Sequence, residues 1–98
     1  MARTPKPHRL ALGTPTTIVL YRTPDRWRYA VYFAGPGGVA DGALGAPSPS
    51  CEPGAAQAAA VRKAEELGRR RLEVRWHAAH EPGWWTGTVT DAGPLPPA

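Results

Sequence analysis

The chain has 98 residues, a formal net charge of +4 and a hydrophobic content of 42%. This length allows one small domain, whose core usually leaves only about 3–5 kcal/mol of net stability, so we expect a second copy of the chain to add burial. The sequence contains no apolar run of the length that a signal peptide or membrane span requires, and the single cysteine, Cys51, excludes an intramolecular disulfide. We therefore expect a cytoplasmic protein.

The two ends of the chain differ from its middle. Residues 1–14 mix basic residues with prolines and show no sustained periodicity, which predicts a disordered basic arm. Residues 91–98 are proline-rich and are predicted to form a disordered tail. The 12 prolines and 11 glycines of the chain are too many for a small core, so most of them should lie outside it. The folded domain is therefore predicted to span residues 15–90.

The first folded segment is predicted to be an antiparallel hairpin. Residues 16–22 are rich in β-branched and aromatic types, and the run 27–34, which follows a proline-containing turn, alternates in character. A period of two directs every second residue from Trp27 onward to the core. It leaves the residues between them, among them Arg28 and Tyr32, on the opposite face.

A helix is predicted in the middle of the chain. The glycine-rich residues 35–38 end the second strand, and residues 39–44 add at most a short third strand. The alanine-rich stretch that follows predicts a helix that begins at Ser50 or Glu52 and ends at Gly68. The residues expected on its sheet-facing side are Ala60, Val61, Ala64 and Leu67, and those expected in solvent are Arg62, Lys63, Glu65 and Glu66.

Two further strands complete the predicted fold. Residues 72–77 alternate, with Leu72, Val74 and Trp76 inward, and residues 84–90 form a closing strand after a turn. The fold class is therefore α+β. It is predicted to have two layers, an antiparallel sheet of four or five strands and one helix packed on its apolar face, in the order strand, strand, optional strand, helix, strand, strand.

The basic residues suggest a surface for nucleic acid. On the outer face of the sheet, arginines would contact phosphates and an aromatic ring would stack on a base. The predicted contacts are Arg28, Tyr32, Arg71, Arg75, Arg3, Lys6 and Arg9, the last three from the basic arm. The competing interpretation is that these charges, together with His77 and Glu73, form the ordinary polar face of a half-buried sheet.

The four tryptophans suggest a protein interface. Trp84 and Trp85 are adjacent on a predicted strand and must point to opposite faces, so only one of them can serve the core. The outward ring would either pack on a neighbouring loop or anchor a dimer or partner contact, because tryptophan is enriched at binding hot spots.

The sequence gives little support for a metal site or a catalytic site. His77, His80 and Glu81 are not ordered like the helical zinc motifs, and Cys51 with a few carboxylates would be the only further ligands. Cys51 precedes the helix but has no base beside it in sequence, and residues 35–38 lack the ending of a phosphate-binding loop. We therefore predict a non-enzyme with no metal, no cofactor and no small-molecule substrate.

The order of elements resembles that of HicB-type antitoxins and, more distantly, of double-stranded RNA-binding domains. The residues that carry the likeness are the strand 27–33, the break at 35–38 and the helix with Ala55 and Ala56 near its start. The likeness covers residues 16–67, whereas the closing segment 72–90 fits neither family. It implies dimerisation and binding of nucleic acid or of a toxin. The composition also resembles that of short proteins from G+C-rich bacterial genomes.

These observations predict a small non-catalytic binding module. The first hypothesis is binding of nucleic acid through the basic sheet face and the N-terminal arm. The alternative is a protein-interaction or dimerisation module that uses Trp84 or Trp85, with the positive charge serving solubility alone. The two hypotheses differ in salt dependence, because phosphate contacts weaken steeply as salt rises and apolar contacts hardly change.

Overall fold

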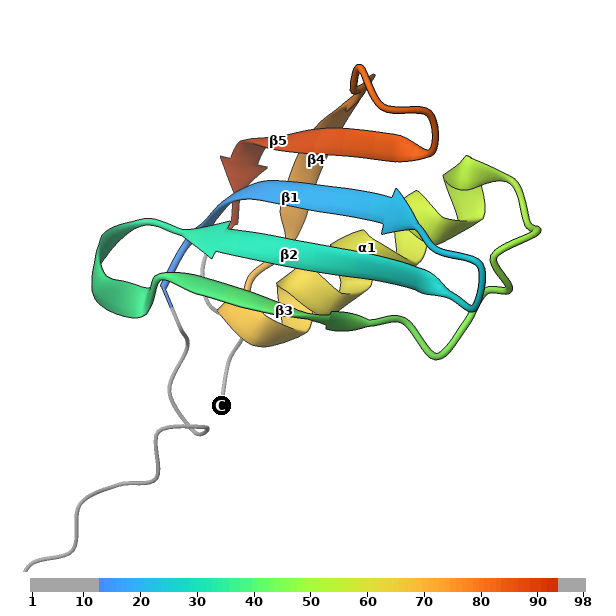
Figure 1. Ribbon diagram of the computed structural model, residues 1–98. Helices are drawn as coiled ribbons and strands as arrows, with labels where there is room; N and C mark the ends of the chain where they lie inside the picture. Colours follow the sequence, from blue (N-terminus) through green and yellow to red (C-terminus); the bar gives the residue numbers. More distant parts are fainter. Residues whose placement is uncertain (1–12, 94–98) are drawn as a thin grey trace, which may run out of the picture.

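The computed structural model describes residues 13–93 and confirms the predicted α+β fold (Figure 1). The elements are β1 (Pro15–Arg22), β2 (Trp27–Phe33), a 3₁₀ turn (Gly35–Gly37), β3 (Val39–Ala43), α1 (Pro53–Gly68), β4 (Leu72–Ala78) and β5 (Trp84–Ala92). Most of the predicted arm and tail, residues 1–12 and 94–98, lies outside the described residues. Between residues 13 and 93, no helix is long and apolar enough to cross a membrane.

The five strands form one sheet in the order β3-β2-β1-β5-β4, and all neighbours are antiparallel. β1 is the central strand, because it pairs with its hairpin partner β2 on one side and with the last strand, β5, on the other. The helix follows β3 at one edge and leads to β4 at the opposite edge. It therefore crosses behind the sheet and covers one of its faces (Figure 1).

The core lies between the sheet and α1. Residues directly opposite each other in neighbouring strands share a face, so the pairs Ile18–Val31 and Leu20–Tyr29 place four large side chains on the inner face. The buried hydrophobic residues are Ile18, Leu20, Trp27, Tyr29, Val31, Phe33, Leu44, Ala56, Ala60, Ala64 and Leu72. The predicted inward face of residues 27–33 is therefore confirmed.

The buried face of α1 differs in part from the prediction. Ala56, Ala60, Ala64 and Gly68 are buried, each four residues from the next, whereas Val61 and Leu67 are only partly buried at its sides. Residues four apart lie on one helix face. The smallest side chains take this face because they let the helix backbone come close to a sheet that already carries large aromatic rings.

The loop between β3 and α1 closes one end of the core. Trp27 is fully buried and its Nε1 donates to the carbonyl oxygen of Ser48 at 3.1 Å. The guanidinium of Arg22 lies over the Trp27 ring, 4.6 Å from its centroid, and its Nη2 donates to the carbonyl oxygen of Cys51 at 3.3 Å. A cation over an aromatic face is attractive. Trp27 and Arg22 thus hold the loop against the sheet.

The ends of two elements depart from the prediction. β5 extends to Ala92, two residues beyond the predicted end, because Asp91 and Ala92 pair with β4 after an irregularity in the ladder. At the other end of the domain Thr14, assigned to the arm, accepts a hydrogen bond from the Ala34 backbone N–H at 2.9 Å. Ordered backbone pairing therefore continues past both predicted domain limits.

The helix ends at Gly68, as predicted. The left-handed residue after the helix is Arg69, with φ 56°, and not the glycine. Gly68 lies against β1: a Cβ atom there would be 2.6 Å from Cδ of Pro15. The glycine is needed for close packing.

Replacing Gly68 with alanine should lower the free energy of unfolding by about 1–3 kcal/mol, because the added methyl group forces the helix end away from Pro15. Gly54, in the same helix, has open space around its Cα, so Gly54→Ala should leave stability unchanged or raise it by up to about 1 kcal/mol. Urea unfolding followed by circular dichroism measures both. Equal effects of the two variants would contradict the packing role of Gly68.

Candidate interaction surface on the outer sheet face

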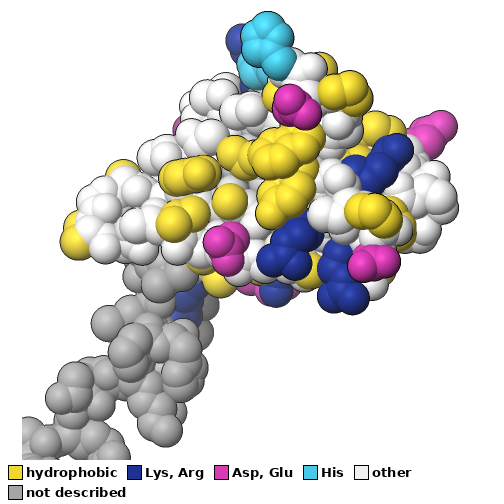
Figure 2. Space-filling model, viewed as in Figure 1, with side chains coloured by type: hydrophobic (Ala, Val, Ile, Leu, Met, Phe, Trp, Pro, Cys, Tyr) yellow, Lys and Arg dark blue, Asp and Glu magenta, His cyan; other side chains and the backbone are white. Residues whose placement is uncertain are grey.

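The sheet has a second face that α1 does not cover, here called the outer face (Figure 2). The strand pairings assign its residues, because partners across the sheet share a side. They are Thr17, Val19 and Tyr21 of β1; Arg28, Ala30 and Tyr32 of β2; Val39, Asp41 and Ala43 of β3; Trp84, Thr86, Thr88 and Asp91 of β5; and Glu73, Arg75 and His77 of β4.

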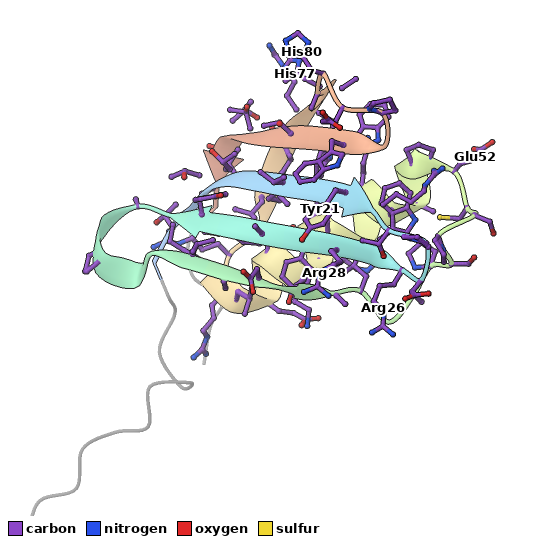
Figure 3. All side chains as sticks on the ribbon, viewed as in Figure 1. Tyr21, Arg26, Arg28, Glu52, His77 and His80 are labelled. Atoms are coloured by element: carbon purple, nitrogen blue, oxygen red, sulfur yellow. The ribbon has the colours of Figure 1, made fainter. Side chains whose placement is uncertain are left out.

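An aromatic stack lies on the outer face. Tyr21 and Trp84 are direct partners across β1 and β5, and their rings stack with centroids 4.3 Å apart at an interplanar angle of 12°. Arg28, the partner of Tyr21 on the other side, donates from Nε to the Tyr21 hydroxyl at 3.3 Å (Figure 3). The stack is thus held by a neighbouring guanidinium while 37% of Trp84 remains exposed.

The outer face carries further apolar side chains, which continue from the stack toward the other end of the sheet. Tyr32 is 45% exposed and Val39 is 52% exposed, and with Trp84 they are the exposed large hydrophobic residues of the described chain. Val19 and Ala30, which are half-buried, lie between them on β1 and β2. In Figure 2 the hydrophobic side chains gather in the centre of this face, with charged ones at its border. The outer face therefore presents an apolar centre.

The charge on the outer face is not basic. Its strands carry two arginines, Arg28 and Arg75, against three carboxylates, Asp41, Glu73 and Asp91, and the numbers are equal when Arg71, which lines the same cavity as Glu73 and Asp91, is included. The domain as a whole is also nearly neutral. The 12 basic residues of the chain include three within positions 1–12, which leaves 9 basic against 8 acidic residues, or +1, in the described part.

The structure brings together three of the predicted nucleic-acid contacts. Arg28, Tyr32 and Arg75 share the outer face as expected. Arg71 lies just before β4, where its carbonyl oxygen accepts the Gly93 N–H at 2.8 Å, and it lines the cavity at the end of α1 together with Glu73 and Asp91. Arg3, Lys6 and Arg9 lie outside the described residues.

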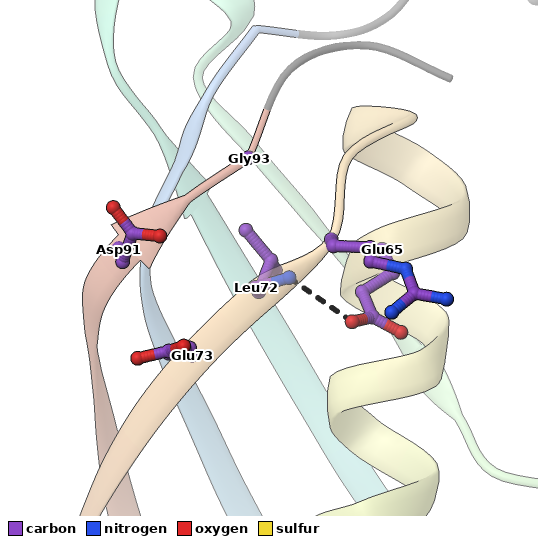
Figure 4. Close-up of a pocket in the computed structure, with 6 residues that line it drawn as sticks. Glu65, Leu72, Glu73, Asp91 and Gly93 are labelled. Atoms are coloured by element: carbon purple, nitrogen blue, oxygen red, sulfur yellow. Dashed lines mark hydrogen bonds between the residues drawn. The ribbon is translucent and has the colours of Figure 1, made fainter. Parts of the chain in front are cut away.

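A polar cavity of about 500 Å³ lies where α1 ends and β4 begins (Figure 4). It is lined by Glu65, Arg71, Leu72, Glu73, Asp91 and Gly93. Glu65 was expected in solvent, yet its Oε2 accepts the backbone N–H of Leu72 at 3.0 Å. This carboxylate therefore ties the start of β4 to the helix. A bond from a helix side chain to the backbone of the next strand leaves no periodic signal in a sequence.

The two adjacent tryptophans point to opposite faces, as predicted. Trp84 is the outward one, opposite Tyr21. Trp85 lies opposite Leu20 on the inner face, where it packs against the core, half-buried, and its Nε1 is buried without a hydrogen-bond partner. Trp84 is therefore the member of the pair that can meet a partner. Tyr21, which completes the surface, was not predicted as a site residue. The alternation of residues 16–22 does place its side chain on the other face of the strand from Ile18 and Leu20.

The histidines and the cysteine lie in different places. His77 and His80 are exposed at the end of β4, while Cys51 lies in the loop before α1, beside Glu52, on another side of the molecule (Figure 3). The Cys51 thiol donates to the carbonyl oxygen of Glu52 at 3.2 Å. Among residues 13–93 there is no group of three histidine, cysteine or carboxylate side chains that could hold a metal ion.

Comparison with known proteins found no match to this chain among protein-family models, curated proteins or solved structures. The resemblance to HicB-type antitoxins thus rests on the residues that suggested it. The basis for a functional proposal is the geometry of the outer face.

Because Trp84 and Trp85 point to opposite faces, replacing each with alanine should lower the free energy of unfolding by different amounts. Trp85→Ala should lower the free energy of unfolding by about 2 kcal/mol or more, because it opens a cavity beside Leu20. Trp84→Ala should cost about 1 kcal/mol, the value of a stacked aromatic pair. Urea unfolding of both variants tests this. A larger loss for Trp84→Ala than for Trp85→Ala would contradict the assignment of the two faces.

Proposed function

We propose that this chain is a non-catalytic protein-binding module and that the apolar centre of the outer face is its binding surface. The observation that carries the proposal is the stacked, partly exposed pair Tyr21 and Trp84, which lies beside the half-buried Val19 on the same face. Tyrosine, tryptophan and arginine are the residues most often found at interface hot spots. Arg28, fixed on the edge of the stack, completes that set.

The partner expected to bind this face is a protein with an apolar surface that can pack against aromatic rings and that has charges of both signs at its rim. The rings of Tyr21 and Trp84 already pack on each other, so little side-chain freedom is lost when a partner covers them. Of the charged residues of the face, Asp41, Glu73 and Arg75 belong to the two edge strands β3 and β4, whereas Arg28 lies on β2 and Asp91 near the end of β5. An apolar centre with a polar rim is the usual anatomy of a protein interface.

The charge balance favours a protein over a nucleic acid as the partner. Binding of phosphate backbones depends on neutralisation of several phosphates by basic side chains. Even when Arg71 is counted with Arg28 and Arg75, the outer face has as many carboxylates as arginines, so it has no excess of positive charge. Nucleic-acid binding through Arg28, Tyr32 and Arg75 remains the competing prediction, supported by the common side of these three residues.

Small organic probes should bind at the apolar centre, since interface hot spots accept apolar groups in general. In ¹⁵N NMR titrations of dilute protein with phenol or isopropanol, the amide signals of Val19, Ala30 and Trp84 should shift most. The signal of Arg62, on the exposed side of α1, should stay in place. Trp84→Ser should remove the response. Shifts concentrated at the cavity beside Glu65, or spread evenly, would overturn the proposal.

Titration of labelled DNA and RNA distinguishes the two hypotheses. We expect any low-salt binding to be lost in the triple variant R3A/K6A/R9A, because these residues supply three of the four net positive charges, and to be kept in R28A/R75A. Fluorescence anisotropy at two salt concentrations measures this. Salt-sensitive binding that R28A/R75A abolishes would instead support a nucleic-acid surface on the sheet.

A further inference from the structure

We infer that the outer face binds a second copy of this chain, in a dimer whose two-fold axis runs along β1. This inference rests on the proposed function and names its partner. The two sheets would face each other with the helices on the outside. Such sheet-on-sheet packing keeps the strands of the two layers within about 30° of each other.

The position of β1 makes the outer face suitable for a two-fold axis. β1 has two strands on each side, β2 and β3 on one and β5 and β4 on the other. A two-fold axis along β1 exchanges these sides, so β2 of one protomer lies over β5 of its partner and β3 lies over β4. The residues that meet across the dimer can therefore be read from the strand pairing.

The first consequence concerns the aromatic stack. Arg28 and Trp84 are the two cross-strand partners of Tyr21, one on each side of β1. Exchange of the sides therefore brings Arg28 of one protomer onto Trp84 of the other, twice in the dimer. A guanidinium over a tryptophan ring is a favourable contact that strengthens when water is excluded. Arg28 and the exposed part of Trp84 thus complement each other.

The second consequence concerns the charged rim. Successive strand pairings form a row across the sheet with one residue from each strand, in the order Asp41, Ala30, Val19, Thr86 and His77. Its two ends, Asp41 on β3 and His77 on β4, are on opposite edges of the sheet and both are exposed. The two-fold axis brings Asp41 of one protomer to His77 of the other. The carboxylate then meets an imidazole, and Arg75 lies two residues from it on the same side of β4.

The size of the face is sufficient for a weak dimer. Five strands about 4.8 Å apart and about eight residues long cover roughly 600 Å² in plan, near the lower end of specific interfaces, which bury about 600–1,000 Å² per partner. A domain of this length gains most from such burial, because its own core is small. We therefore expect a dimer that forms with rising protein concentration.

Sedimentation equilibrium of the full chain tests the inference. The wild type should pass from monomer to dimer as concentration rises, and Trp84→Ser or Tyr32→Glu should raise the dissociation constant about tenfold or more. Tyr32 is exposed, so its variant should keep the amide spectrum of the folded wild-type chain. Glu66→Lys, on the exposed side of α1, is the matched control and should dimerise like the wild type.

Charge reversal tests the position of the axis. Asp41→Lys and His77→Asp should each raise the dissociation constant about two- to fivefold, and the double variant D41K/H77D should restore it. The two residues lie on opposite edges within one chain, so rescue can come only from contact between chains.

The outcomes separate the inference from the proposed function. A wild type that stays monomeric at millimolar concentration would overturn the dimer, while probe binding at Val19 and Trp84 would still support a protein-binding face. A dimer that Trp84→Ser and Tyr32→Glu leave intact would place self-association elsewhere and overturn the inference. Failure of D41K/H77D to rescue would exclude an axis along β1.

Discussion

A single helix can cover only one face of a five-stranded sheet, and the rest of this structure follows from that constraint. Side chains alternate along each strand, so every strand presents one set of residues to α1 and another to the opposite side. In most half-exposed sheets the second set is polar. Here it includes Val19, Tyr21, Tyr32 and Trp84, which form an apolar centre that no part of residues 13–93 covers.

The central position of β1 connects this surface to the fold. Because β5 returns to pair with β1, the last strand brings Trp84 next to Tyr21, from the first strand, although 62 positions separate them in the chain. The same pairing sets Arg28 on the other side of Tyr21. The surface is thus built from three strands that belong to opposite ends of the domain, and it exists only when the sheet is complete.

Local patterns allowed much of the fold to be predicted. The alternation from Trp27 to Phe33 identified a strand and its inner face, and the alanine-rich run ending at Gly68 identified the helix. The opposite orientations of Trp84 and Trp85 also followed from the period of two. Local patterns could not provide the strand order, because it depends on contacts between distant segments, or the bond from Leu72 to Glu65, because it depends on how the end of the helix meets the next strand.

The net charge of the whole chain differs from that of the described domain. A formal charge of +4 favoured nucleic acid, but three basic residues, Arg3, Lys6 and Arg9, lie at positions 1–12, outside the described domain. The domain that remains carries +1, and its outer face has no excess of arginines over carboxylates. Total charge describes the whole chain, whereas binding depends on how charge is distributed over a particular face.

Self-association through the outer face can be tested by ¹⁹F NMR of the chain labelled with 5-fluorotryptophan, recorded from low micromolar to millimolar concentration. The four tryptophans give four signals, which single Trp→Phe variants assign. We expect the Trp84 signal alone to move strongly with concentration, as the outward ring becomes covered by a second copy. A constant Trp84 signal combined with movement of Trp76 or Trp85 would contradict it, because the contact would then involve another surface.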